Sequence, residues 1–505
     1  MQKHFFSTAS VIALLVAGPA LANDSLVDQI GAGNIANVDQ TMGEEGDSDI
    51  DQIGNGNLAE VTQDEDPNGS ASFSTPTNVA TILQNGDNSR ARIEQFNPGG
   101  GTGVTNTASI DQDSSNLETV PSGYALNGRI IQSGEGNAST IKQRGNAPAP
   151  LEGSGLTARN DQSGDFNTST IEQRDDDANP HSDVDVTQTG NSNTSTVLQR
   201  GPNEDIDVVQ NGDNNTSDVE QGGKRDLTTM VTQNGNDNNS TVLQKGRRNT
   251  ANVAQSDDNQ TSNLNQDMDS EDAIADVTQS GGSNDSTVNQ TAAINGSSVN
   301  VDQSGNGETS TVNQSGDAQA VSVAQSGNGN NSTVGQTGNN GDVDIMQSGT
   351  NGTNDVTQAG DNSLAEVTQS GVSNGSIILQ DGSTLSAIVN QSGSGNSSKI
   401  DQSGDNHQAS LTQGGLSSGN QNFVTQTGDF NIASVTQNGS NSISNITQSD
   451  DNHSATVLQE MAGNNSTITQ MGLGAGNMAN VSQLTGGNNS TVYQDGQNNS
   501  ATVTQ

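Results

Sequence analysis

Glutamine is the residue type whose spacing in this chain points to a definite chemistry. From Gln303 it recurs every eleven residues, and the series continues in both directions with occasional longer steps to a total of forty copies. A carboxamide has two N–H donors and an acceptor oxygen, so amides stacked in a row can pair with one another. The spacing therefore predicts a hydrogen-bonded structural ladder. Its core members are Gln233, Gln244, Gln303, Gln314, Gln325, Gln336, Gln347, Gln358, Gln369, Gln380, Gln391, Gln402 and Gln413.

The residues that usually carry catalysis or bind metals form no pattern of their own. His181, His407 and His453 have no partners at metal-ligand spacing, the chain has no Cys, and no phosphate-binding loop or nucleophile elbow is present. We therefore assign no catalytic residue, no metal site and no cofactor. Acidic turns such as Gln84-Asn-Gly-Asp-Asn leave divalent-cation binding open as an alternative, although no turn position is invariably acidic.

The residues before each ladder glutamine indicate a β-strand. Val, Ile or Leu stands two positions earlier, as at Val242, Val312 and Val334, with one departure at Asn160, and Ser or Ala usually stands four positions earlier. This alternation with period two is typical of a strand with one specialised face. Gly, Asn and Asp follow the glutamine and favour a tight turn, in which Asn238 and Asn330 are further ladder candidates.

Each eleven-residue unit therefore predicts a strand of about five residues and a turn, and two units predict one coil of about 22 residues. Coils stacked at the cross-β spacing would place like residues over like residues. The predicted fold class is an all-β, amyloid-like β-solenoid with a thin core of Val and Ile rows. A buried glutamine is costly unless it is paired, and stacking would pair it at every coil.

The composition excludes several classes of protein. Hydrophobic residues make up 27% and aromatic residues 2%, too few for the core of a conventional globular domain of 505 residues. The net charge of −44 argues against nucleic acid as a partner, because phosphate binding requires basic patches. The 15 Lys and Arg residues are scattered, with Lys224–Arg225 and Arg247–Arg248 as the densest pairs, so we expect no basic surface. Outward Asp and Glu are expected to delay association of the chain.

The sequence divides into three segments. Residues 1–22 combine Lys3 and His4, a short apolar run and Ala20-Leu21-Ala22, which predicts a secretory signal peptide cleaved before Asn23. The apolar run is too short to span a bilayer, so we expect no integral membrane segment in the mature chain. Residues 23–202 are predicted to be irregular repeats with loop insertions at Pro67, Pro76, Pro98, Pro121, Pro148, Pro150 and Pro180. Residues 203–505 are predicted to be a regular repeat array.

The repeat resembles a known family. The pattern Gln-x-Gly-x-x-Asn-x-Ser/Ala-x-x-x-Gln, present as Gln233, Gly235, Asn238, Ser240 and Gln244, is similar to the curlin repeat of curli fibre subunits. A second copy stands at Gln325, Gly327, Asn330, Ser332 and Gln336. The resemblance implies a bacterial extracellular amyloid fibre that acts in adhesion and biofilm matrix. It also implies export through outer-membrane machinery and nucleation by a minor subunit.

The two ends of the repeat array are the predicted assembly sites. The first repeat strand contains Ser25, Val27 and Gln29, and the last contains Ala501, Val503 and Gln505. Because an uncapped strand edge can pair with another chain, we expect each end to template the next molecule and form a homopolymer. The alternatives are that the ends fray without templating, or that the protein is a soluble secreted β-solenoid adhesin. A mixed residue before each ladder glutamine argues against ice binding.

Overall fold

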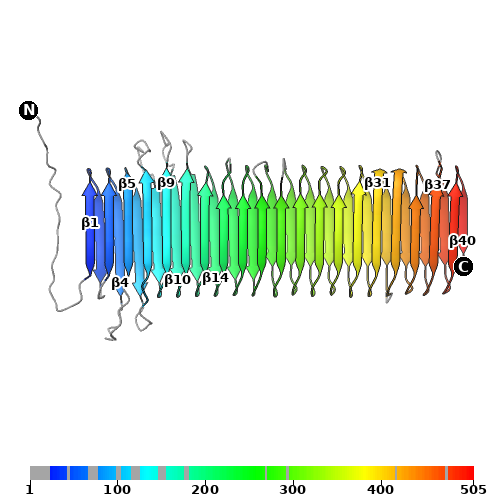
Figure 1. Cartoon of the computed structure of the whole chain (residues 1–505), viewed down its shortest axis with the longest axis horizontal. Helices are drawn as coiled ribbons and strands as arrows, with labels where there is room; N and C mark the ends of the chain where they lie inside the picture. Colours follow the sequence, from blue (N-terminus) through cyan, green and yellow to red (C-terminus); the bar gives the residue numbers. More distant parts are fainter. Residues whose placement is uncertain are drawn as a thin grey trace, which may run out of the picture. The chain divides into compact units, whose positions relative to one another are not determined.

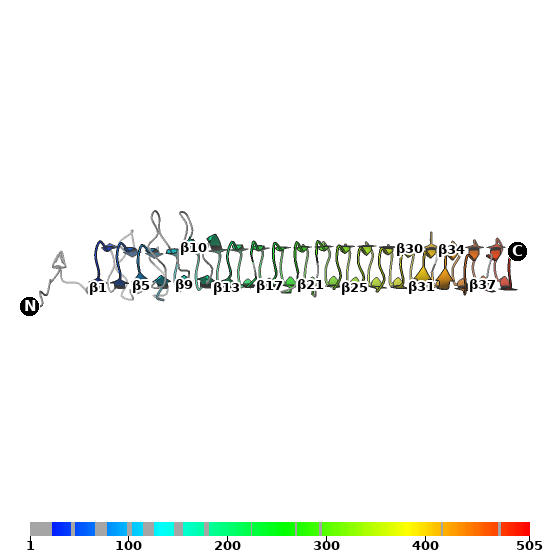
Figure 2. The same ribbon diagram turned by 90° about the horizontal axis from the view of Figure 1, so that it is seen from above.

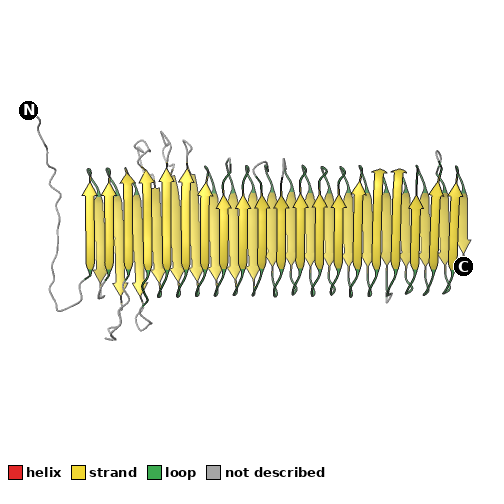
Figure 3. Cartoon of the chain, in the orientation of Figure 1, coloured by secondary structure: helices red, strands yellow, loops and turns green. Residues whose placement is uncertain are grey.

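The computed structural model describes residues 23–41, 46–65, 78–97, 104–114, 126–145, 155–175, 181–223, 225–267, 270–291, 295–415, 418–472 and 476–505. The predicted signal peptide and the prolines of the predicted loop insertions lie outside the described residues. The described residues form strands joined by turns (Figure 3), which confirms the all-β class. Backbone contacts divide the chain into two compact units, Met1–Asp226 and Leu227–Gln505. The sequence-based boundary at residue 202 stays a prediction.

The strands of the first unit are six to nine residues long and share a motif that ends at or just after the ladder glutamine. In chain order they are β1 (Asp24–Ile30), β2 (Ile35–Thr41), β3 (Asp47–Ile53), β4 (Leu58–Glu65), β5 (Val79–Gly86), β6 (Arg90–Asn97), β7 (Thr107–Ser114), β8 (Leu126–Ser133), β9 (Ala138–Gly145), β10 (Gly155–Ser163), β11 (Thr168–Asp175), β12 (His181–Thr189), β13 (Thr194–Arg200), β14 (Asp205–Asn211) and β15 (Thr216–Gln221).

The second unit repeats the same motif with less variation. Its strands are β16 (Thr228–Asn234), β17 (Asn239–Gln244), β18 (Thr250–Ser256), β19 (Thr261–Gln266), β20 (Ile274–Gln279), β21 (Asp285–Gln290), β22 (Ser298–Gln303), β23 (Thr309–Gln314), β24 (Ala320–Gln325), β25 (Asn331–Gln336), β26 (Asp342–Gln347), β27 (Thr353–Gln358), β28 (Leu364–Gln369), β29 (Gly375–Asp381), β30 (Ser386–Gln391), β31 (Ser397–Asp405), β32 (Gln408–Gln413), β33 (Gln421–Asp429), β34 (Ile432–Gln437), β35 (Ile443–Gln448), β36 (Ser454–Gln459), β37 (Asn465–Met471), β38 (Met478–Gln483), β39 (Asn489–Asp495) and β40 (Ser500–Thr504).

Each unit consists of two parallel sheets that face each other. Odd-numbered strands form one sheet and even-numbered strands the other, as Figure 2 shows for the layers and Figure 1 for the alternating strand directions. Thr309 of β23 pairs with Asn331 of β25, and Gln314 pairs with Gln336, so like positions are in register. One coil spans 22 residues here and 24 where the turns are longer. The β-solenoid prediction is confirmed.

Alternation of buried and outward side chains along the interior strands builds the core. In β25, Ser332, Val334 and Gln336 are buried, whereas Asn331 and Thr333 are exposed. Each strand therefore contributes one small, one branched and one amide side chain to a layer between the two sheets, as the period of two predicted. Several strands are longer than the predicted five residues, in some cases because their pairing continues past the glutamine, as in β31 with nine residues.

Glycine is required in the turns for a steric reason. Gly327, two residues after a ladder glutamine, has φ of 128°, a conformation that other residues rarely adopt. A Cβ atom added there would lie 1.9 Å from the carbonyl oxygen of Gly349 in the next coil. The turns thus approach one another as closely as the strands do, which explains why Gly recurs with the glutamine period.

Candidate functional site

The glutamine side chains form continuous hydrogen-bonded rows inside the second unit. The Nε2 atom of Gln325 donates to Oε1 of Gln347 at 2.8 Å, while Oε1 of Gln325 accepts from Nε2 of Gln303 at 2.9 Å. Between predicted ladder glutamines on successive strands of the same sheet, from Gln303 to Gln413, the Nε2–Oε1 distances are 2.6 to 3.0 Å. All thirteen side chains are at most 2% exposed.

The second N–H of each amide ties the two sheets together. Nε2 of Gln325 also donates to the backbone carbonyl of Thr309 at 3.0 Å, at the start of the preceding strand. Nε2 of Gln336 reaches the carbonyl of Ala320 in the same way at 3.4 Å. One amide therefore satisfies both donors and its acceptor, linking coil to coil and sheet to sheet. Full pairing removes most of the cost of burying a polar group.

The predicted valine and asparagine positions lie beside these rows. Val242, Val312 and Val334 are at most 1% exposed, so they pack between the sheets. Asn330 is also buried, but its amide bonds backbone groups: Oδ1 accepts from the N–H of Gly352 at 2.8 Å, and Nδ2 donates to the carbonyl of Gly349 at 3.1 Å. Asn238 likewise accepts from the N–H of Gln260 at 2.9 Å. The asparagine rows thus fasten each turn to the turn of the next coil.

The two sheets differ in the small residue that they bury, which the eleven-residue repeat did not reveal. Four positions before the glutamine, odd strands of the second unit mostly carry Ser, whereas even strands carry Ala or Val except for Thr229 in β16. The odd-strand hydroxyls include those of Ser240, Ser262, Ser286, Ser310, Ser332, Ser376, Ser398 and Ser444, which are buried without a hydrogen-bond partner in the described structure. A reading at 22 residues would have found this signal.

Asn160, the departure noted at the branched position, has a local explanation. It lies in β10 of the first unit and is fully buried. Its Nδ2 donates to the hydroxyl of Ser139 on the facing strand β9. The polar substitution is therefore offset in part by a serine of the odd-strand sheet.

Four buried ionisable residues, Glu204, Glu308, His407 and His453, occupy asparagine-row positions, a placement that sequence reasoning did not predict. His407 and His453 are buried; their Nδ1 atoms accept from the N–H groups of Asn431 and Asn477 at 3.2 and 3.1 Å. Their Nε2 atoms lie 3.0 and 2.7 Å from the carbonyls of Ser403 and Ser449, so the neutral ring with its proton on Nε2 satisfies both contacts. The rings thus replace the carboxamide of asparagine.

Glu308 occupies the same kind of position and is fully buried. Its Oε2 atom accepts from the backbone N–H of Asn330 at 2.8 Å. Burial raises the pKa of Glu308, and hydrogen bonds from the backbone and side chain of Asn330 lower it only in part. The signal in the sequence is an acid six residues before a ladder glutamine, Gln314.

The expectation that basic residues are scattered is wrong for the first unit. Coiling places Arg92, Arg129 and Arg159 in register on the consecutive even strands β6, β8 and β10. On the odd strands, Arg174 is in register with both Arg144 and Arg200. These residues are 26 to 37 positions apart, with insertions of differing length between them, so spacing along the sequence concealed the alignment.

The predicted assembly ends belong to exposed strands. All residues of β1, including Ser25, Val27 and Gln29, are exposed, and Val27 retains 41% exposure although it pairs with Ile50 of β3. The amide of Gln29 still donates to Gln52. In β40, Ala501 and Val503 are half-buried, and Gln505 accepts from Gln483 at 3.2 Å.

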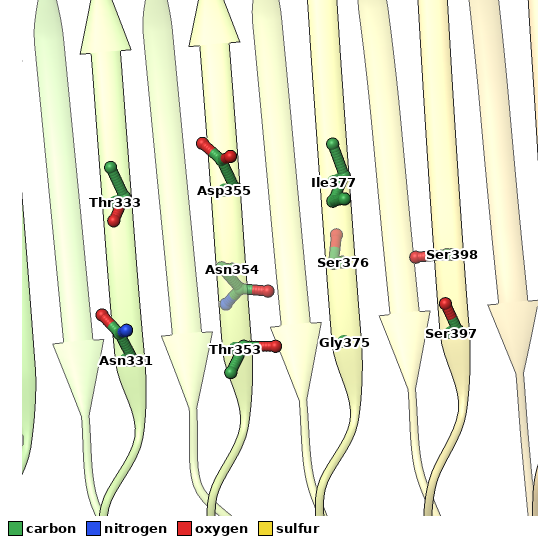
Figure 4. Close-up of a pocket in the computed structure, with 10 residues that line it drawn as sticks. All are labelled: Asn331, Thr333, Thr353, Asn354, Asp355, Gly375, Ser376, Ile377, Ser397 and Ser398. Carbon is green, nitrogen blue, oxygen red and sulfur yellow. The ribbon is translucent and has the colours of Figure 1, made fainter.

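The described residues offer no constellation for chemistry. No group of three or more His, Asp or Glu side chains is placed to hold a metal within the described ranges. A hollow on the odd strands β25, β27, β29 and β31 is lined by Thr333, Asp355, Ser376 and Ile377, with Gly375 beside them (Figure 4). It contains one carboxylate and no base or nucleophile pair. Among the described segments there is also no helix of the length and apolar character needed to cross a membrane.

Comparison with known proteins agrees with the repeat geometry. The curlin associated repeat matches residues 182–212, 225–256, 316–349, 360–393, 385–415 and 474–505. No curated protein matches the chain. The matched stretches contain copies of the ladder glutamine, the branched residue before it and the glycine turn after it. The chain therefore contains curlin repeats between residues 182 and 505.

Proposed function

We propose that this protein is a structural subunit of an extracellular, curli-like amyloid fibre that grows by stacking of coils between molecules. The observation that carries the proposal is the glutamine row, because each coil presents to the next the same donors and acceptors that it receives. A second molecule that offers a like coil would continue both sheets and both rows without any new type of contact.

The terminal strands support growth at the ends of the array. The backbone of β1 pairs with β3 along one edge, and that of β40 pairs with β38. The side chains of both strands are more exposed than the same positions in interior coils, where Val and Gln are buried. Docking of another coil would bury Val27 or Val503 and pair the remaining amide groups of Gln29 or Gln505.

The presence of curlin repeats supports the cellular part of the proposal. We infer a bacterial protein secreted after removal of residues 1–22, which acts in adhesion and biofilm matrix. Its partners would be further copies of itself, a nucleating subunit and outer-membrane export machinery. The role is structural, with no enzymatic activity and no cofactor.

The first test is X-ray fibre diffraction on the mature protein, residues 23–505, after incubation at moderate salt. Sedimentable fibrils with a meridional reflection near about 4.7 Å and an equatorial one near about 10 Å would support the proposal. A protein that remains soluble and monomeric with β-rich circular dichroism would contradict it. That outcome would favour the alternative, a soluble secreted β-solenoid adhesin.

The second test places a charged, proline-containing cap after Gln505. Because proline cannot donate to a strand ladder and like charges repel, we expect elongation from preformed seeds to slow at least several-fold. The matched control carries a Gly/Ser extension of equal length, which should elongate as the uncapped protein does. Equal elongation of both variants would show that the C-terminal strand does not template growth.

A further inference from the structure

The outer face of the even-strand sheet in the first unit has a sharp division of charge. One column of outward side chains, three positions before the glutamines, contains Arg92, Arg129 and Arg159, and it continues on the next two strands with Asp185 and Asp207. Arg159 is directly in register with Asp185, so the sign changes between β10 and β12. We name the face formed by β8, β10, β12 and β14 the divided face.

The aspartates of the divided face are crowded by charges of their own sign. Asp183 and Asp185 on β12 pair in register with Asp205 and Asp207 on β14. Burial raises the pKa of Asp185, Arg159 lowers it and Asp207 raises it again. Burial also raises the pKa of Asp207, and Asp205 adds to this effect. A single arginine in register with these four carboxylates leaves an excess of negative charge.

The arginines pair with carboxylates of their own molecule but stay partly exposed. Arg129 lies 3.3 Å from Glu94, and Arg159 donates from Nε and Nη2 to Asp161 on its own strand. The side chains of Arg129 and Arg159 retain 37% and 48% exposure. Exposed ion pairs contribute little to stability, so these side chains can exchange partners.

We propose that the divided face binds the divided face of a second copy of this chain, related by a two-fold axis that runs along the strands between β10 and β12. This rotation reverses the order of the strands and brings the faces together. Arg159 then lies opposite Asp185 of the second copy, and Arg129 lies opposite Asp207 of the second copy. Both pairs form twice, as an isologous interface requires.

The proposed interface is small, so we expect isolated molecules to bind each other weakly. Four strands at about 4.8 Å spacing, each with about eight residues at about 3.3 Å, cover roughly 500 Å² per molecule. Stable interfaces bury about 800 Å² per partner, so pairing of isolated molecules is weak and depends on salt. The contact is lateral and does not rest on the fibre proposal, although fibres joined through many copies would bundle firmly.

Charge reversal tests the pairing with the full mature chain. On the divided face, Arg129→Asp with Arg159→Asp makes the column acidic at all four strands, and Asp185→Arg with Asp207→Arg makes it basic at all four. We expect each variant alone to lose the dimer that the wild type forms at low salt in sedimentation velocity, and an equimolar mixture of the two to regain it. Arg144→Asp with Arg200→Asp on the odd-strand sheet changes the net charge equally and should leave the dimer intact.

Three results would overturn the proposal: a monomeric wild type at low salt, a mixture that does not regain pairing, or loss of pairing in the odd-strand control. Circular dichroism checks the fold of each variant. Arg129→Gln with Arg159→Gln provides a milder pair if the reversed variants do not fold, and it is expected to weaken the dimer at least tenfold.

An introduced cysteine separates lateral pairing from end-to-end growth. The chain has no Cys, so Thr187→Cys on β12 supplies a single thiol close to the proposed axis. A short bismaleimide should cross-link it between copies, whereas Thr196→Cys on β13 of the other sheet should remain largely uncross-linked. Fibre growth without Thr187→Cys cross-links would refute this interface and leave the fibre proposal standing. Cross-linked dimers without fibres would support this interface and contradict the fibre proposal.

Discussion

At the scale of single residues, Glu308 places a carboxyl group at a buried row position where asparagine offers a donor. Its neighbour Asn284 in the same row donates Nδ2 to the carbonyls of Ser280 and Gly305 at 2.7 and 3.1 Å. An ionised Glu308 has no hydrogen with which to do the same, whereas a protonated carboxyl has one. Protonation would supply the donor, and burial moves the pKa of Glu308 in the direction that favours it.

The substitution Glu308→Gln tests this account. A group whose pKa is raised by folding stabilises the fold below its unfolded pKa of about 4.3 and loses that contribution as pH rises through the folded value. At pH 7 we expect Glu308→Gln to stabilise the second unit by about 1 kcal/mol, the size of one net hydrogen bond. Urea unfolding followed at pH 7 and pH 4 measures the difference. A gain that persists unchanged at pH 4 would contradict the protonation argument.

At the scale of elements, the two sheets of each coil are not interchangeable. Odd strands of the second unit place Ser332 and its equivalents in the core, and even strands place Ala365, Val321 and similar side chains there. A buried hydroxyl without a partner costs about 1–3 kcal/mol. The odd-strand sheet therefore bears the cost of an unpaired buried hydroxyl at most of its strands, and the even-strand sheet does not.

We expect Ser332→Ala to leave stability unchanged or to raise it by about 1 kcal/mol, because the methyl group keeps the packing and removes an unpaired hydroxyl. The reverse change on the facing sheet, Ala365→Ser, should lower stability by a similar amount. Hydrogen exchange of the amides in β25 and β28 compares the two locally. Clear destabilisation by Ser332→Ala would mean that the hydroxyl has a partner in solution.

Some of these residue positions could be predicted from the sequence and others could not, for physical reasons. Gln336 and Val334 could be placed because one face is buried and a period of two is then enforced. The distinction between Ser332 and Ala365 was missed because a period of eleven superimposes both sheets. Glu308 was missed because isolated acids among many asparagines give no periodic signal. The alignment of Arg129 with Arg159 depends on the lengths of intervening loops, which leave no trace in local spacing.

At the scale of the whole molecule, the net charge of −44 opposes the end-to-end association of like chains, which the Arg–Asp pairs of the divided face do not offset. Exposed charges are screened over about 30 Å at 0.01 M salt and about 8 Å at 0.15 M. We expect the lag before assembly to shorten at least several-fold across this range, as measured by light scattering. Calcium and sodium chloride compared at equal ionic strength provide the control, since a much larger effect of calcium would indicate binding at acidic turns beyond screening.

The alternation of Ser-bearing and Ala-bearing strands also constrains how such a chain can change in length over generations. A duplication or deletion of 22 residues adds or removes one complete coil and returns every later strand to its own sheet. A change of eleven residues would transfer every later strand to the opposite sheet, so that its hydroxyl groups would meet the wrong neighbours. Genes for this architecture are therefore expected to grow and shrink in steps of two repeats.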